Sequence, residues 1–368
     1  MSAEKKIWRV GWRLAVALFL LAFIFHTIFL NEGRFAWSHR ETPWEGLSRW
    51  QQWRIAWTLG PVELWRTISL VPFRVFALSL ALMGVTILIG VARWRRVLRV
   101  QGLALPLGRA AGISFVAHFF NSFLLGSTGG DLMKAYYAAR ETHHKKTEAV
   151  VTVLVDRLIG LWAMLLFAGA MMLPNLSLLA HHRRLAILAL VILAMLGTCS
   201  LVLGVAFWGG VSRRFPRARM LLRRLPRADS LERAVEACRQ FGKGKRFLLE
   251  TLALSMILNA VCVLQLFVIS RGLGLNIPAR VLFVVVPMII CISALPITPS
   301  GLGVRENLFV WMLAVPEINV PATSALSLSL LAYAGSLFWS LVGGAVYLGL
   351  KERQHLEEVV AGPAEENG

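Results

Sequence analysis

The stretch LAILALVILAMLGTCSLVLGVAFWGG, residues 185–210, holds no charged side chain over 26 residues. A helix needs about 20 predominantly apolar residues to cross a bilayer. Hydrophobic residues make up 57% of the 368-residue chain and charged residues only 16%, whereas soluble domains carry about 25% charged residues. Disordered and disulfide-rich classes are excluded as well. The seven other apolar segments are 14–30, 75–92, 110–127, 149–173, 247–270, 281–297 and 322–350.

The excess of basic residues is large, with 39 Lys and Arg against 20 Asp and Glu. Most of it lies in three stretches, 1–13, 93–109 and 211–247. Cytoplasmic segments of membrane proteins are enriched in Lys and Arg, and such segments also contact anionic lipid headgroups. We therefore expect a cytoplasmic amino terminus and a cytoplasmic basic loop at 211–247, and no nucleic-acid partner.

The topology follows from the charge pattern and from whether an even or odd number of crossings separates two charged stretches. If 1–13, 93–109 and 211–247 are all cytoplasmic, both ends of the apolar segment 110–127 are cytoplasmic too. A segment at about 106–128 must then enter the membrane and return. If the tail is also cytoplasmic, 281–316 does the same from the opposite face. We predict an all-α polytopic membrane protein with about six full transmembrane helices and two re-entrant helical hairpins of opposite orientation. The alternative is eight full crossings.

Residues 1–350 are expected to form a single integral membrane domain, followed by a short acidic tail at 351–368. The segment 31–72 holds six of the 13 tryptophans, and Trp50, Trp53 and Trp57 share one helical face. That pattern is typical of a helix lying at the headgroup level. No transit peptide is evident, so we expect a multi-pass protein of a prokaryotic plasma (inner) membrane.

The first polar motif inside the apolar segments is GSTGGDLMK, residues 126–134. Glycines permit tight turns, and the start of a helix favours an anion. Asp131 is either the N-cap of a helix over 131–141 or a functional anchor, and the two roles are compatible. Asp156 and Arg157 form a second charged pair, near the cytoplasmic end of segment 149–173.

A similar motif, PSGLGVRE, spans residues 299–306. Neighbouring residues on a helix point about 100° apart, so Arg305 and Glu306 should each have a different partner. We expect Arg305 to bind a phosphate or to pair with Asp131 or Asp156, and Glu306 to pair with Arg157. A structural salt-bridge network is the competing interpretation.

Sequence patterns of known catalytic sites are missing: there is no GxSxG, HExxH, Walker A or dinucleotide motif. The four cysteines lack the spacing of a zinc site or a disulfide framework. We expect no catalytic residue, no metal and no cofactor, and hence not an enzyme.

Three segments resemble the signatures of the lysylphosphatidylglycerol synthase transmembrane-domain family, also called flippase-like or UPF0104. They are GSTGGDLMKAYYAAR (126–140), VDRLIGL (155–161) and PITPSGLGVRE (296–306). Lys134 stands where many members of that family have Arg. The resemblance implies a lipid-translocating membrane domain with re-entrant elements. The substrate-binding residues that it and the charge pattern mark are Gly129, Gly130, Asp131, Lys134, Arg157, Gly301, Gly303, Arg305 and Glu306.

Bifunctional members of that family carry a soluble aminoacyl-transferase domain after the membrane part. Here only 18 residues follow segment 322–350, so the chain resembles the stand-alone membrane module. We expect a flippase or scramblase for a phospholipid or lipid-linked headgroup. The alternatives are an enzyme that acts on a polyprenyl phosphate or lipid-linked sugar through Asp131, and a non-transporting scaffold for a separately encoded lipid-modifying enzyme.

Overall fold

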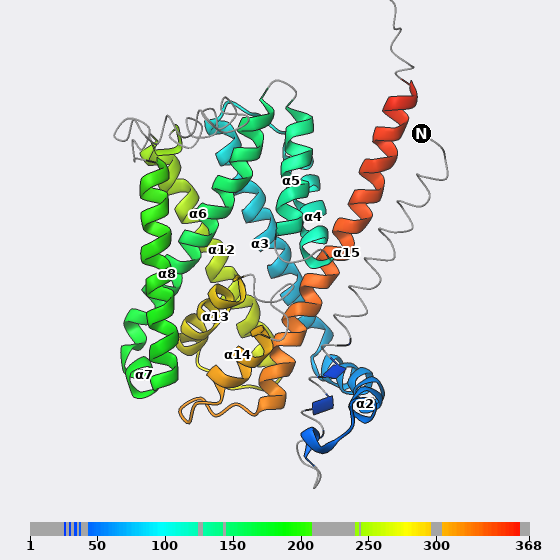
Figure 1. Ribbon diagram of the computed structural model, residues 1–368, viewed down its shortest axis with the longest axis vertical. Coiled ribbons are helices and arrows are strands. Elements are labelled where there is room, and N and C mark those ends of the chain that lie inside the picture. Colours follow the sequence, from blue (N-terminus) through cyan, green and yellow to red (C-terminus); the bar gives the residue numbers. More distant parts are fainter. Residues whose placement is uncertain are drawn as a thin grey trace, which may run out of the picture.

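The computed structural model describes residues 26, 29–30, 33–34, 37, 43–123, 128–142, 145–207, 240–242, 244–295 and 304–360. Within these ranges the regular elements are all helices (Figure 1). They are η1 (Trp44–Gly46), α2 (Arg49–Leu70), α3 (Phe73–Val100), α4 (Leu107–Phe123), α5 (Thr128–Glu141), α6 (Lys146–Met172), η2 (Leu173–Asn175), α7 (Leu176–His181), α8 (Arg183–Phe207), α12 (Lys245–Gly272), α13 (Ala279–Ser293), α14 (Val304–Leu313) and α15 (Ala322–Val360).

Five helical stretches are long and apolar enough to cross a membrane: α3, α6 continued through α7, α8, α12 and α15. They coincide with five of the six full crossings predicted from the sequence. The sixth predicted crossing, 14–30, lies almost wholly outside the described residues. The prediction of an all-α polytopic membrane protein is confirmed.

The first re-entrant segment is longer than the predicted 106–128. It folds as two short antiparallel helices, and the second of them lies beyond the predicted end. Helix α4 has 17 residues and α5 has 14, both shorter than a bilayer requires. An ion pair of 2.6 Å between Arg109 Nη2 and Glu141 Oε1 joins the start of α4 to the end of α5. Both ends of this hairpin therefore lie at the same end of the bundle, the upper end in Figure 1.

The second predicted re-entrant segment is also a pair of short helices, α13 with 15 residues and α14 with 10. They occupy the lower half of Figure 1, opposite the first hairpin. Asn175 Nδ2 lies 3.5 Å from the carbonyl oxygen of Arg280, at the start of α13. After α14, Glu317 lies 2.5 Å from His182. Both ends of this hairpin thus adjoin the turn between α6 and α8, as two oppositely oriented hairpins require.

Small residues let the helix backbones come into contact around the first hairpin. A Cβ on Gly130 would lie 2.0 Å from the carbonyl oxygen of Ala117, and one on Gly343 would lie 2.1 Å from that of Phe115. Close approach of this kind is a common basis of helix packing in membranes. The glycines therefore hold α5 against α4 and α4 against α15.

Helix α2 carries the aromatic face predicted for an interfacial helix. Trp50 and Trp53 stack with ring centroids 4.9 Å apart, and Trp57 follows at 6.2 Å from Trp53. All three rings are exposed. In Figure 1 this helix lies at the lower end of the molecule, the end that holds α7 and α14. Aromatic side chains at such a boundary anchor a protein at the headgroup level.

Several predicted features lie outside the described residues. These are most of the basic loop at 211–247, both glycines of the second motif, Gly301 and Gly303, and residues 361–368 of the acidic tail. The assignment of the upper end to the cytoplasm stays a prediction from the charge pattern.

Candidate functional site

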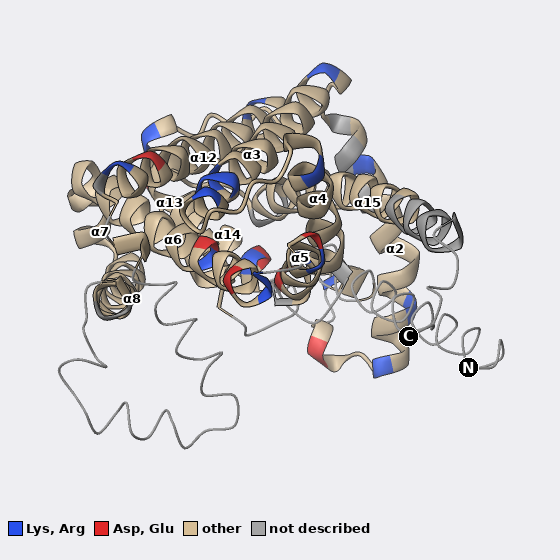
Figure 2. Cartoon of the chain, turned by 90° about the horizontal axis from the view of Figure 1, so that it is seen from above, with Lys and Arg blue, Asp and Glu red and all other residues tan. Residues whose placement is uncertain are grey.

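Two pairs of charged residues face each other across α5 and α6. Asp131 and Lys134 are three residues apart on α5 and so share one helical face. Lys134 Nζ lies 3.2 Å from Asp156 Oδ2, and Arg157 Nη1 lies 3.6 Å from Asp131 Oδ2. Figure 2 shows acidic and basic segments gathered where α5 lies beside α6. The structure thus brings together four charged residues that the sequence singled out.

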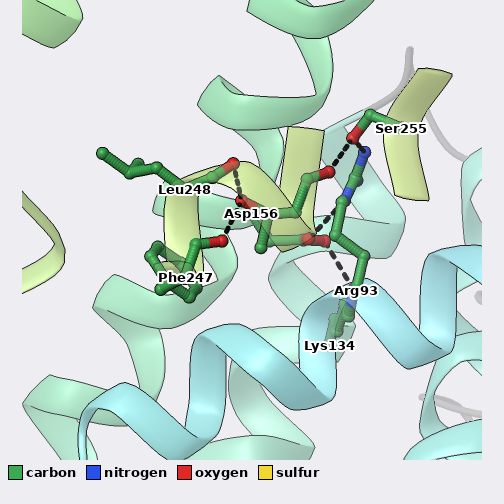
Figure 3. A network of polar contacts seen from close by, with 7 residues as sticks. Arg93, Lys134, Asp156, Phe247, Leu248 and Ser255 are labelled. Atoms are coloured by element: carbon green, nitrogen blue, oxygen red, sulfur yellow. Dashed lines mark hydrogen bonds and ion pairs between the residues drawn. The ribbon is translucent and has the colours of Figure 1, made fainter. Parts of the chain in front are cut away.

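Asp156 also binds an arginine from a third helix. Arg93 Nε donates to Asp156 Oδ1 at 2.9 Å, and Arg93 Nη1 donates to the Ser255 hydroxyl of α12 at 3.1 Å (Figure 3). Only 13% of the Arg93 side chain, 12% of Lys134 and 8% of Asp156 are exposed. We call Arg93, Lys134, Asp156 and Ser255 the Asp156 cluster.

Arg93 and Asp156 of the Asp156 cluster lie within helices that are long and apolar enough to cross a membrane, roughly two to three turns from their upper ends. Asp156 is ten residues into α6, roughly 15 Å along the helix at 1.5 Å per residue. Arg93 is seven residues from the end of α3, roughly 10 Å along it. Charged residues at such depth are costly and mark functional sites in membrane proteins by default. Two cations share one carboxylate here, so the cluster carries one more positive than negative charge.

Neighbouring residues shape the surroundings of the two cations. Lys134 Nζ lies 4.2 Å from the ring centroid of Trp94, a favourable cation–π contact. Trp94 is fully buried, and its indole N–H has no acceptor among the described residues. Gly160 makes room for Arg93, because a Cβ at this position would lie 2.8 Å from Arg93 Nη2.

A second polar cluster forms where α14 begins, at the tip of the second hairpin. Arg305 Nη2 donates to Glu306 Oε1 at 2.5 Å, and Arg305 Nε donates to the Ser329 hydroxyl of α15 at 3.2 Å. The guanidinium carbon lies 4.7 Å from the ring centroid of Tyr333. The buried Tyr333 hydroxyl has no hydrogen-bond partner in the described part of the chain. We call Arg305, Glu306, Ser329 and Tyr333 the Arg305 cluster.

Two expectations about the second motif were wrong. Arg305 and Glu306 were expected to have different partners, with Glu306 paired to Arg157. Instead Arg305 donates to Glu306 and Arg157 faces Asp131, because the long arginine side chain spans the angle between adjacent positions. Arg305 was also expected to pair with Asp131 or Asp156. Asp156 instead binds Arg93 and Lys134, and Asp131 faces Arg157.

The first motif also differs from its predicted form. The helix begins at Thr128 rather than at Asp131, so Asp131 lies in the first turn and is not the N-cap. Gly129 is buried. Gly130 serves the packing of the hairpin, and its N–H donates to Asn121 Oδ1 at 2.9 Å. Gly301 and Gly303 are outside the described residues, so their predicted role in binding stays a prediction.

Sequence reasoning missed Arg93, Trp94, Ser255, Ser329 and Tyr333. Arg93 was counted with the basic stretch 93–109, whose sum sets the topology. The available signal was its place as the residue of that stretch nearest to the apolar segment 75–92. Trp94 stands among the arginines of the same stretch. The other three are neutral residues among apolar ones, which gives no signal without knowledge of their neighbours.

Comparison with known proteins places this arrangement in a family. The family model for the lysylphosphatidylglycerol synthase TM region matches residues 46–344. The chain belongs to this family. The match to the lysylphosphatidylglycerol synthase TM region runs from η1 into α15 and so includes both hairpins and both polar clusters.

Two archaeal members are similar over most of their length. A UPF0104 membrane protein of Pyrococcus horikoshii is 25% identical over 320 residues, which cover 79% of this chain and 94% of the relative. A UPF0104 membrane protein of Methanothermobacter thermautotrophicus is 23% identical over 299 residues, covering 74% and 83%. This chain is thus a multi-pass membrane protein of the lysylphosphatidylglycerol synthase TM-region family.

Proposed function

We propose that this protein moves a phospholipid, or a lipid-linked molecule with an anionic headgroup, between the two leaflets of a membrane. The observation that carries the proposal is the Asp156 cluster, in which Arg93 and Lys134 share a single buried carboxylate within the membrane-spanning helices. An excess positive charge in a low-dielectric environment is strongly stabilised by an anion. A lipid that is being translocated carries its phosphate past the headgroup level, where the phosphate can bind this cluster.

The hairpin geometry supports transport over simple binding. Short paired helices that enter from opposite faces are typical of transporters, which bind substrate near the midplane between such elements. Each hairpin here places a charged motif near its tip, Asp131 and Lys134 on α5 and Arg305 on α14. A headgroup can pass from one of these charged motifs to the other without entering the hydrocarbon.

The role of each residue in headgroup binding follows from the chemistry of its side chain. Lys134 and Arg93 bind the phosphate, and the indole N–H of Trp94 adds a neutral donor beside Lys134. Arg305 offers a planar guanidinium suited to phosphate oxygens, next to the Tyr333 hydroxyl. The Asp131–Arg157 pair is more exposed, with 44% of the Arg157 side chain accessible, and contacts the headgroup beside the Asp156 cluster. The glycines keep the hairpin backbones close.

In this proposal the lipid crosses chemically unchanged, so the protein is not an enzyme and needs no cofactor or metal. Its partner is the membrane lipid itself. We place the protein in a prokaryotic plasma membrane with its amino terminus in the cytoplasm, because the basic stretches then face the cytoplasm. The family's name refers to a lipid headgroup modification, which favours a phospholipid over other amphiphiles.

Translocation in proteoliposomes tests the proposal. Headgroup-labelled fluorescent lipids with anionic, zwitterionic and polyprenyl-phosphate headgroups would be quenched from outside. We expect the wild type to expose the inner-leaflet pool of an anionic lipid. Lys134→Gln should slow this about tenfold, as expected for the loss of a charge-assisted hydrogen bond. Lys146→Gln, the same change at the exposed start of α6, is the matched control.

Three outcomes would contradict the proposal. The first is a folded wild type that moves none of the three lipid classes. The second is a folded Lys134→Gln variant that matches the wild type, which would remove the Asp156 cluster from the pathway. The third is a chemically altered lipid, detected by mass spectrometry, which would favour an enzyme.

A further inference from the structure

A groove of about 420 Å³ lies between the start of α8 and the end of α14. Its volume falls within the range of small-molecule sites. The floor is apolar and is formed by Leu185, Leu188, Val310 and Met312. Such a floor accommodates hydrocarbon rather than a polar solute.

The rim of the groove is basic, formed by His181, His182 and Arg183. The two histidines already have partners: His181 Nδ1 lies 2.6 Å from the carbonyl oxygen of Ser177, and His182 Nε2 lies 2.5 Å from Glu317. Arg183 is exposed, and no partner for its guanidinium occurs among the residues that the structure describes. The rim therefore offers an uncompensated cation.

The sequence places the groove near the boundary between water and hydrocarbon. The uncharged run 185–210 begins two residues after Arg183, so we place the rim at headgroup level and the floor below it. Trp311 also lines the groove and is 62% exposed. Tryptophan is enriched at this level of the membrane. A cation at the headgroup level above an apolar channel matches the shape and charge of a phospholipid.

We propose that this groove holds one anionic phospholipid of the leaflet at the lower end in Figure 1. Its phosphate lies at Arg183, and one acyl chain runs over Leu185, Leu188 and Met312. Glu317 beside His182 limits the favourable region to the Arg183 side of the rim. This site is separate from the two polar clusters, and its occupancy does not depend on lipid translocation.

Tryptophan quenching by brominated lipids tests the site. The protein would be reconstituted in vesicles of unlabelled phosphatidylcholine with a small fraction of brominated phosphatidylglycerol or brominated phosphatidylcholine. The difference between the wild type and Trp311→Phe isolates the quenching of Trp311. We expect roughly two- to fivefold greater occupancy by phosphatidylglycerol, the range of a partly exposed ion pair. Trp311→Phe alone should leave the fold intact, since this ring is exposed.

Arg183→Gln should abolish the preference for phosphatidylglycerol. Arg280→Gln, which removes a charge from the same end but outside the groove, should keep it. Equal quenching by the two lipids, or a preference retained in Arg183→Gln, would overturn the proposal. Loss of the preference in millimolar inorganic phosphate would also overturn it, because the rim would then bind free anions. These binding results do not depend on lipid translocation. A protein that binds phosphatidylglycerol in this groove but moves no lipid would contradict the proposed function and not this site.

Discussion

Lys134 Nζ lies 3.2 Å from one carboxylate oxygen of Asp156, while Arg93 Nε lies 2.9 Å from the other. The three residues come from α5, α3 and α6, so one carboxylate links the first hairpin to two membrane-spanning helices. The Arg93 bond to Ser255 adds α12. The cluster is therefore both a joint between helices and a site of excess positive charge.

Replacing Asp156 should destabilise the protein more than replacing Lys134. Asp156→Asn leaves two buried cations without a carboxylate, at a cost of about 3–5 kcal/mol, the usual penalty for breaking a buried pair. Lys134→Gln leaves the Arg93–Asp156 pair balanced and should cost about 1 kcal/mol. Thermal unfolding in detergent would rank them. The double variant Asp156→Asn/Lys134→Gln should be more stable than Asp156→Asn alone. If Lys134→Gln lost as much stability as Asp156→Asn, this assignment of charge would be contradicted.

Gly160→Ala should impair translocation and should lower stability less than Asp156→Asn does. The new methyl group would lie under 3 Å from both terminal nitrogens of Arg93, and the flexible guanidinium can shift aside at little cost. The hydrogen bond from Arg93 to Asp156 would then be altered. Gly169→Ala on the same helix is the control, because its Cβ would meet Leu196 at an ordinary 3.5 Å. We expect a several-fold lower translocation rate for Gly160→Ala only. Equal rates would show that the position of Arg93 is unimportant.

Arg305→Lys should fail to replace arginine despite keeping the charge. The guanidinium bonds Glu306 and Ser329 together and also lies against the Tyr333 ring. A lysine ammonium is a point charge that cannot make this planar, forked set of contacts. We expect translocation by Arg305→Lys to fall close to that of Arg305→Ala, measured in the same proteoliposomes. Full activity of Arg305→Lys would show that charge alone suffices.

Cysteine accessibility should confirm the opposite orientation of the hairpins. In a variant without native cysteines, Gly108→Cys and Lys146→Cys flank the first hairpin, and Arg280→Cys and Ala314→Cys flank the second. All four positions are exposed. A membrane-impermeant thiol reagent should label the first two from one side and the last two from the other. Labelling of Gly108→Cys and Lys146→Cys from opposite sides would support eight full crossings instead.

The fold could be predicted because it depends on two properties of the sequence: the length of each apolar run and the sum of the charges in each connecting stretch. The length of an apolar run such as 185–210 is read directly, and a sum of charges fixes which ends share a side. The hairpins followed from that sum, and the first also from His118, Asn121 and the glycines that interrupt its apolar sequence.

The pairing of charges was less predictable, because it depends on helix rotation and on distant partners. Asp131, Lys134 and Asp156 stood out as charges within apolar sequence. Arg93 did not, since it lies beside other arginines and only its contact with Asp156, 63 positions away, sets it apart. Arg305 was misassigned because a rule about adjacent positions ignores the reach of a long side chain.

The contact between Phe115 and Gly343 has a consequence for biogenesis. The helix backbones meet here so closely that an added Cβ would lie 2.1 Å from the Phe115 oxygen, yet about 230 residues separate the two positions. At about 5–20 residues per second, the ribosome needs roughly 10 to 50 seconds to make that length. The first hairpin must therefore remain in the membrane in contact with α3 and α6 until α15 is synthesised and can pack against α4.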